Sequence, residues 1–148
     1  MSKAADVSFE TTLFVRDTCL CLHLQRAARA LARRFDDALR PLGMTSGQFS
    51  MMMALNRPVP PSIGSVAALL SMDRTTLTAA LKPLQRRELV IVRVDGEDRR
   101  GRRLKLTPAG RALLARAVPV WRHTHAAVDR LLPPDGADRL RQALQALS

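Results

Sequence analysis

The spacing of apolar residues in the first third of the chain predicts a long helix. Apolar side chains recur there every three or four positions, which draws one apolar stripe along a helix. The members of this stripe are Leu20, Leu24, Ala27, Leu31, Phe35, Ala38 and Leu42. Pro41 and Gly43 should stop the helix. A second row at helical spacing indicates either a solvated face or a face turned toward DNA, and it consists of Arg26, Arg29, Arg33 and Arg40.

Capping residues and prolines divide the next segment into three shorter helices. Thr45 should begin a helix that runs to about Asn56, after which the proline-rich segment 57–61 should form a loop. Ser62 can cap a short third helix whose apolar residues are Ile63, Val66, Ala67 and Leu70. A turn of three residues, 71–73, then leads to a fourth helix, for which the carboxylate of Asp73 is a suitable N-cap.

The fourth helix has two chemically different faces. Its apolar stripe consists of Leu77, Leu81 and Leu84. The opposite side is short, polar and basic, with Arg74, Thr75, Thr78, Lys82 and Arg86. Such a face can approach base edges and phosphates without steric hindrance.

After Leu89 the apolar period changes to two, which predicts a β-hairpin. Residues 90–94 and 103–106 should be its strands, and the charged segment 95–102 should be its loop. Thr107 and Pro108 then open a fifth helix, which Pro119 should kink and Pro133 should end. Its stripe includes Leu114, Ala117, Trp121, Val128 and Leu131. A last helix carries Leu140, Leu144 and Leu147.

The amino-acid composition indicates which class of partner the protein binds. The 148 residues, which we expect to form a single domain (1–148), include 24 Lys and Arg against 13 Asp and Glu, a formal charge of +11. This surplus calls for an anionic partner, and nucleic acid is the first candidate. No apolar run is long enough for a membrane span, residues 1–6 do not form a secretory signal, and two cysteines two positions apart are a poor disulfide framework. We therefore expect a reduced, cytoplasmic protein that does not bind membranes.

Two helices joined by a three-residue turn and followed by a hairpin describe a winged helix-turn-helix. The predicted fold class is mainly α with a small β-wing, together with a helical dimerisation region. The hairpin tip, residues 99–103, carries four arginines, and arginine suits the narrow, electronegative minor groove of DNA. The first and last helices carry apolar stripes that a unit of this size cannot bury alone, which favours a homodimer.

Three sequence blocks resemble the MarR family of transcriptional regulators: residues 73–78, residues 84–90, and residues 98–110. The last block, with an acidic-x-Arg wing signature followed by Leu-Thr-x-x-Gly, is fairly specific. The resemblance implies a DNA-binding part at about 45–107 and a helical dimerisation part at about 8–42 and 108–148. It also implies an obligate homodimer in which the first, fifth and sixth helices interlock. Two positions depart from the pattern: Glu88 stands where the family usually has a glycine, and Pro83 lies inside the fourth helix.

The resemblance and the polar faces together assign residues to DNA. On the fourth helix and in the wing they are Arg74, Thr75, Thr76, Thr78, Lys82, Asp98, Arg99, Arg100 and Arg102. By the resemblance, Arg100 enters the minor groove and Asp98 holds the wing through a charge-assisted hydrogen bond. The family also implies a cavity for small aromatic ligands between the two parts. Candidate lining residues, which otherwise belong to the core, are Met51, Met52, Met72 and Trp121.

Cys19 and Cys21 have several possible roles. On one continuous helix Cys19 and His23 would share a face, but two ligands do not make a metal site, and we predict neither a metal nor a cofactor. The cysteines either pack in a dimer helix or sense oxidants. Cys21 sits near the place where the hydroperoxide-sensing branch of the family keeps its reactive cysteine, although that branch also uses tyrosines and this chain has none.

The predicted function is a sequence-specific regulator that binds double-stranded DNA, a homodimeric repressor released from a near-palindromic operator by a small ligand or an oxidant. A sequence-nonspecific architectural DNA-binding protein and a thiol-based redox sensor are the alternatives. An enzyme is not predicted, because the chain shows no nucleophile with a base, no phosphate-cradling glycine loop and no metal-ligand set.

Overall fold

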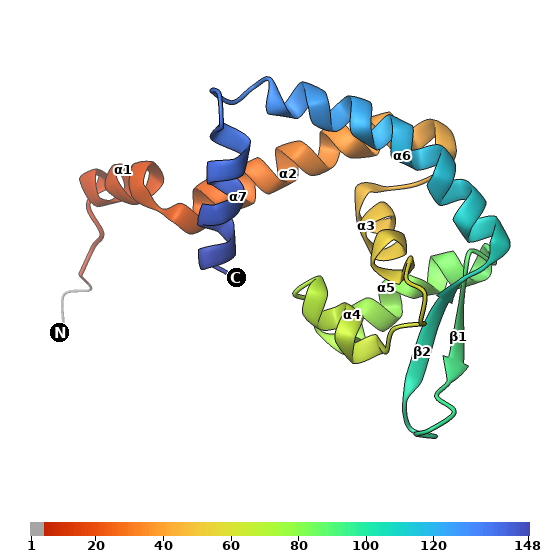
Figure 1. Ribbon diagram of the computed structural model, residues 1–148. Helices are drawn as coiled ribbons and strands as arrows, with labels where there is room; N and C mark the ends of the chain where they lie inside the picture. Colours follow the sequence, from red (N-terminus) through yellow and green to blue (C-terminus); the bar gives the residue numbers. More distant parts are fainter. Residues whose placement is uncertain (1–4) are drawn as a thin grey trace.

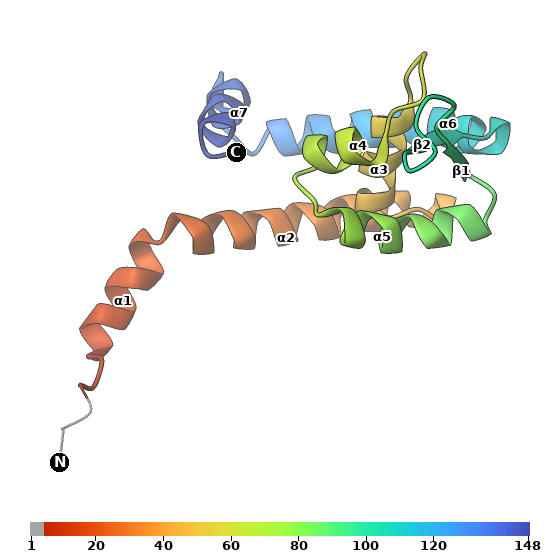
Figure 2. The same cartoon turned by 90° about the horizontal axis from the view of Figure 1, so that it is seen from below.

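Two long helices carry the rest of the molecule. In the computed structural model, which describes residues 5–148, α2 (Leu20–Leu39) and α6 (Pro108–Asp129) run beside each other (Figure 1). A short 3-10 helix, η1 (Arg40–Leu42), ends the first of them. Helix α1 (Phe9–Thr18) projects away from the body at the start of α2, whereas α7 (Gly136–Ala146) follows α6 (Figure 2). None of the helices within residues 5–148 has both the length and the apolar content needed to cross a membrane.

A winged helix-turn-helix unit packs against these two long helices, which its first helix contacts (Figure 1). It consists of α3 (Ser46–Leu55), α4 (Ile63–Leu69), α5 (Arg74–Arg86) and the antiparallel hairpin of β1 (Val90–Val94) and β2 (Arg102–Leu106). The strand register pairs Val90 with Leu106 and Val94 with Arg102. Ser71 makes the turn between α4 and α5 with a left-handed backbone (φ 50°), the usual conformation just after a helix end. The predicted fold class is confirmed.

The predicted N-caps are in place, since each side chain accepts a backbone N–H of the first helical turn. Thr45 begins α3 and forms a capping box with Gln48, while Ser62 and Asp73 begin α4 and α5. The core lies beneath these helices. Its largest fully buried side chains, from α2, α3, α4, α5 and the hairpin, are Leu39, Met52, Val66, Leu77, Leu81, Leu84, Val90 and Leu104.

A tight junction joins the start of α6 to the end of α5. The Thr107 hydroxyl donates to the carbonyl of Glu88 (2.6 Å) and accepts from the backbone N–H of Gly110 (2.9 Å), so it ties the two elements together. A Cβ added to Gly110 would lie 2.1 Å from the Leu89 carbonyl oxygen, so only glycine allows this approach. The Leu-Thr-x-x-Gly pattern therefore has a steric cause. Glu88 adopts the left-handed conformation (φ 57°) that its glycine-like position requires, at a cost of about 1 kcal/mol.

The helix predicted from the stripe that starts at Leu20 is present as α2, and a separate helix, α1, precedes it. The backbone of Cys19 is extended (φ −67°, ψ 109°), and Cys19 both ends α1 and caps α2. Cys19 still lies one turn before His23, whose backbone N–H donates to the Cys19 carbonyl (3.1 Å). The expected stripe is also incompletely covered within one chain, since Leu20 is 67% and Leu31 is 38% exposed.

Smaller differences concern the ends of elements and the prolines. Strand β2 begins at Arg102, one residue earlier than expected, and α6 ends at Asp129, before Pro133. Helix α5 continues through Pro83 and α6 continues through Pro119, and Figure 1 shows α6 curving along its length. The lost N–H donors therefore do not break either helix.

The junction yields a stability prediction. Gly110→Ala should lower the free energy of unfolding by about 3 kcal/mol, because the new methyl group would overlap the Leu89 carbonyl oxygen. Gly47→Ala is the matched control, since its Cβ would meet nothing closer than 4.0 Å in helix α3, and it should raise stability by roughly 0.5 kcal/mol. Urea unfolding of both variants, followed by circular dichroism, measures the two effects. Equal free energies of unfolding for the two variants would contradict the close contact between Gly110 and the Leu89 carbonyl.

Candidate nucleic-acid interface

The front turn of α5 is held by the carboxylate of Asp73. Its two oxygens accept hydrogen bonds from the backbone N–H and the hydroxyl of Thr76, both at 2.8 Å. These bonds from Thr76, the backbone N–H first, lower the pKa of Asp73. The cap places a negative charge at the positive end of the helix dipole and orients the residues that follow. It also occupies the Thr76 hydroxyl, so a DNA contact through this group would compete with the cap.

The two faces of α5 separate as the sequence predicts. Leu77, Leu81 and Leu84 are buried in the core. The predicted DNA-binding side chains of this helix, all exposed, are Arg74, Thr75, Thr76, Thr78 and Lys82. A row of short polar and basic side chains on one exposed helix face can enter the major groove.

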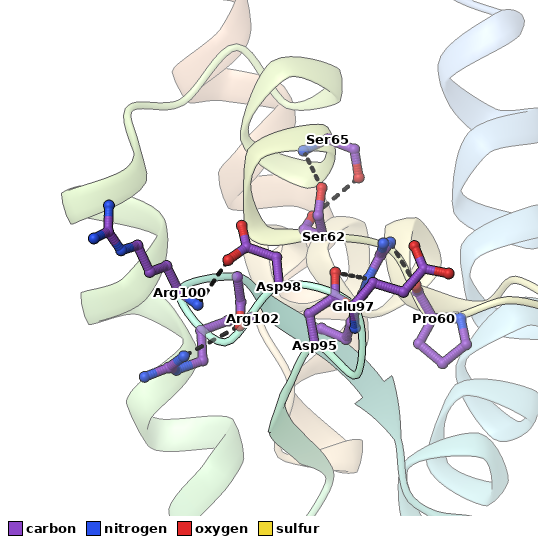
Figure 3. Close-up of polar contacts among 10 residues, drawn as sticks. Pro60, Ser62, Ser65, Asp95, Glu97, Asp98, Arg100 and Arg102 are labelled. Atoms are coloured by element: carbon purple, nitrogen blue, oxygen red, sulfur yellow. Dashed lines mark hydrogen bonds and ion pairs between the residues drawn. The ribbon is translucent and has the colours of Figure 1, made fainter.

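The wing tip is built around Asp98. Its side chain accepts a hydrogen bond from the backbone N–H of Arg100 (2.9 Å), while its carbonyl accepts from the N–H of Gly101 (2.9 Å). This charge-assisted bond therefore reaches the backbone of Arg100 and leaves the guanidinium exposed at the tip (Figure 3). The Arg102 guanidinium donates to the carbonyls of Arg99 and Gly101, both at 3.1 Å, and so closes the turn.

Arg103 has a different role from the other wing arginines. The sequence predicts it as part of the cationic tip, but its guanidinium forms an ion pair with Asp95 (3.0 Å). It also donates to the carbonyl of Pro60 (3.3 Å), which attaches the wing to the proline-rich loop. Asp95 accepts the N–H of Glu97 as well (3.0 Å), and this bond, followed by Arg103, lowers the pKa of Asp95. No local pattern in the sequence predicts this brace, although the β-strand register brings residues 95 and 103 near each other.

A cleft of about 380 Å³ lies between α4, the front of α5 and the wing. Arg74 and Thr78 line it from α5, and Asp98, Arg100 and Arg102 line it from the wing. The structure thus brings five of the predicted DNA-binding residues to one place. Thr75, Lys82 and Arg99 are exposed but do not line this cleft.

The remaining predicted site residues lie elsewhere. Cys21 is exposed on α2 with its sulfur 3.3 Å from the amide nitrogen of Gln25, and Cys19 is partly buried; both are free thiols. Met51 and Met52 belong to the core, whereas Met72 and Trp121 are partly buried against it. Trp121 stacks on Phe49 with ring centroids 6.0 Å apart. Among residues 5–148, no cluster of three His, Cys, Asp or Glu side chains could hold a metal ion.

This arrangement is shared with solved DNA-binding regulators. The chain is 37% identical to the transcriptional regulator MosR of M. tuberculosis, solved in complex with DNA, with a TM-score of 0.78 over 87% of this chain and 92% of that one. The chain belongs to the MarR family of transcriptional regulators. This MarR-family protein is therefore a DNA-binding regulator and not an enzyme.

Two further relatives support this assignment. The MarR-family chain is 27% identical to the transcriptional repressor CouR, solved with a 23-mer DNA duplex, with a TM-score of 0.80 over 97% of this chain and 99% of that CouR chain. It is 32% identical over 95 residues to the transcriptional activatory protein BadR of Rhodopseudomonas palustris. That match covers 62% of this chain and spans about half (54%) of the length of BadR. No protein-family model matches the sequence.

Proposed function

We propose that the protein is a homodimeric repressor that recognises a near-palindromic DNA site. The observation that carries this proposal is the cleft between α5 and the wing, where cationic side chains of two elements meet on one exposed face. The DNA complexes of MosR and CouR support it, and the name of CouR favours repression. BadR is named an activatory protein, so the direction of control is part of the proposal.

The DNA-binding residues divide into three roles. Thr75 and Thr78, exposed on the front of α5, read base edges in the major groove. Lys82, one turn further along the same exposed face, contacts phosphate. Arg100, at the wing tip, enters the narrow minor groove, where the electrostatic potential is most negative.

The dimer is proposed from apolar surface that one chain leaves uncovered. Helix α1 has no buried residue, and its Phe9 and Phe14 are 74% and 65% exposed. Leu20 at the start of α2 and Leu140 in α7 are also exposed. Patches of this kind usually mark an interface. We therefore assign residues of about 8–42 and 108–148 to dimerisation and residues of about 45–107 to DNA binding.

Release is proposed to follow binding of a small aromatic ligand. CouR has been solved with p-coumaroyl-CoA, which shows that a relative of this chain binds an aromatic compound. The candidate contacts remain Met51, Met52, Met72 and Trp121, of which the last two are partly exposed and could meet a ligand without opening the core. Adaptable methionines beside an aromatic ring suit a flat apolar ligand.

The proposed function can be tested by measuring the mass of the protein in solution and by selecting the DNA duplexes that it binds. Sedimentation at micromolar concentration should give about twice the 16.3 kDa of one chain, and selection from random duplexes should enrich a near-palindrome. Phe14→Asp should shift the protein toward the monomer, because it places a charge in the proposed interface. Val59→Asp, at an equally exposed valine (72%) in the proline-rich loop, is the control and should remain dimeric. A monomeric wild type would reject the dimer, and enrichment of no sequence would favour an architectural DNA-binding protein.

The wing assignment predicts a specific loss of affinity. Arg100→Ala should weaken binding to the selected site by about 1–3 kcal/mol, with the largest loss where A·T-rich flanks narrow the minor groove. Lys82→Ala should weaken binding to all sequences alike. It should also reduce the slope of log affinity against log salt concentration by about one. Arg116→Ala, an exposed arginine on α6, removes the same charge away from the wing and should change little. Fluorescence anisotropy at several salt concentrations distinguishes the three variants, and unchanged affinity for Arg100→Ala would reject the wing assignment.

A redox switch is the second candidate for release, favoured by the exposure of Cys21. Its thiolate would attack a hydroperoxide, which leaves as an alcohol while the sulfur becomes a sulfenate. A tenfold loss of affinity needs only about 1.4 kcal/mol of difference between two dimer states. After treatment with cumene hydroperoxide, operator affinity should fall in the wild type and in Cys19→Ser but not in Cys21→Ser. Unchanged affinity in the oxidised wild type, with release by salicylate-like compounds, would favour the ligand instead.

A further inference from the structure

Three guanidinium groups from two separate elements line the cleft between α5 and the wing. Arg74 comes from the first turn of α5, and Arg100 and Arg102 come from the hairpin. Figure 3 shows the side chains of Arg100 and Arg102 extending to the same side of the wing. Three arginines thus line a single cleft of about 380 Å³.

The carboxylates of this cleft do not neutralise these arginines. Asp95 is paired with Arg103, and the side chain of Asp98 accepts the backbone N–H of Arg100. No ion pair involving Arg74, Arg100 or Arg102 occurs among residues 5–148. The Asp95–Arg103 ion pair carries no net charge. Against the three arginines, the cleft then holds one further carboxylate, that of Asp98, and so keeps an excess of positive charge. An anion is the ligand that such a cleft would stabilise.

Gly64 of α4 leaves the space that the Arg74 guanidinium occupies. A Cβ added to Gly64 would lie 2.7 Å from Nη2 and 3.3 Å from Cζ of Arg74, so the guanidinium rests directly against the backbone of α4. The backbone of Gly64 is ordinary helix and does not itself require glycine. Glycine in a helix is less stable than alanine by about 0.5–1 kcal/mol. The structure shows one effect that compensates for this loss of stability: the missing side chain of Gly64 leaves room for the guanidinium of Arg74.

We propose that this cleft seats a backbone phosphate of the DNA strand that separates the groove facing α5 from the groove entered by the wing. Gly64 is a positioning residue, since its missing side chain lets Arg74 lie against α4 and face this phosphate. The inference rests on the proposed DNA-binding face and adds a residue that itself contacts no DNA. Guanidinium groups bind phosphate through paired N–H donors, so the orientation of Arg74 matters as well as its charge.

The test is Gly64→Ala, measured by fluorescence anisotropy on the selected duplex and on a random duplex. The methyl group displaces the guanidinium, so affinity for both duplexes should fall on the order of tenfold, the loss expected for one charged hydrogen bond. The slope of log affinity against log salt concentration should become shallower by about the contribution of one phosphate contact. Gly96→Ala is the matched control, because a Cβ there meets nothing within 4 Å, and it should bind like the wild type.

Two further variants separate positioning from a general effect on the fold. Arg74→Ala should lose as much affinity as Gly64→Ala, and the double variant should lose no more than Arg74→Ala alone, since the glycine acts only through this arginine. Equal binding by Gly64→Ala and Gly96→Ala would overturn the proposal, as would a full additional loss in the double variant or a wild-type salt slope for Arg74→Ala. Unchanged binding in Arg100→Ala and Lys82→Ala would instead show that the DNA-binding face itself is misassigned.

Discussion

The contact between Gly110 and the Leu89 carbonyl is the constraint on which the rest of the structure depends. It brings the first turn of α6 onto the residue where α5 has ended and β1 is about to begin. The Thr107 hydroxyl closes the same junction by bonding Glu88 and Gly110 at once. A long helix proposed for dimerisation and a helix proposed to face DNA are thus joined at one point, because glycine allows two backbones to approach this closely.

A second link starts from the same end of α5 and leads to α2. Arg87, the C-cap of α5, donates to the carbonyl of Gly43 (2.6 Å), just after α2 and η1 end. Asp36 of α2 accepts the backbone N–H of Ser46 at the start of α3 (2.7 Å). The C-terminal end of helix α5 is therefore attached to both long helices, to α2 through Arg87 and to α6 through Thr107.

The positive charge of the chain is divided between support and recognition. Arg87, Arg103 and Arg111 donate to carbonyls that lie outside their own turns, at Gly43, Pro60 and Leu106. These arginines hold elements together and have little freedom to follow DNA. Within residues 5–148, Arg74 and Arg100 form no ion pair with a carboxylate, and both remain exposed at the cleft. Net charge alone indicates an anionic partner, but the contacts decide which cations can meet it.

The sequence by itself determined the elements and their order, since caps and apolar stripes depend on residues within four positions of each other. Asp73 beginning α5 and Leu77 facing the core are of this kind, and the sequence places both correctly. Contacts between distant residues decided the rest. Arg103 reaches Pro60, 43 positions away, so it braces the wing, while Arg100 in the same run of arginines stays at the tip. Gly64 similarly meets Arg74 only because two helices cross, a geometry that no local pattern records.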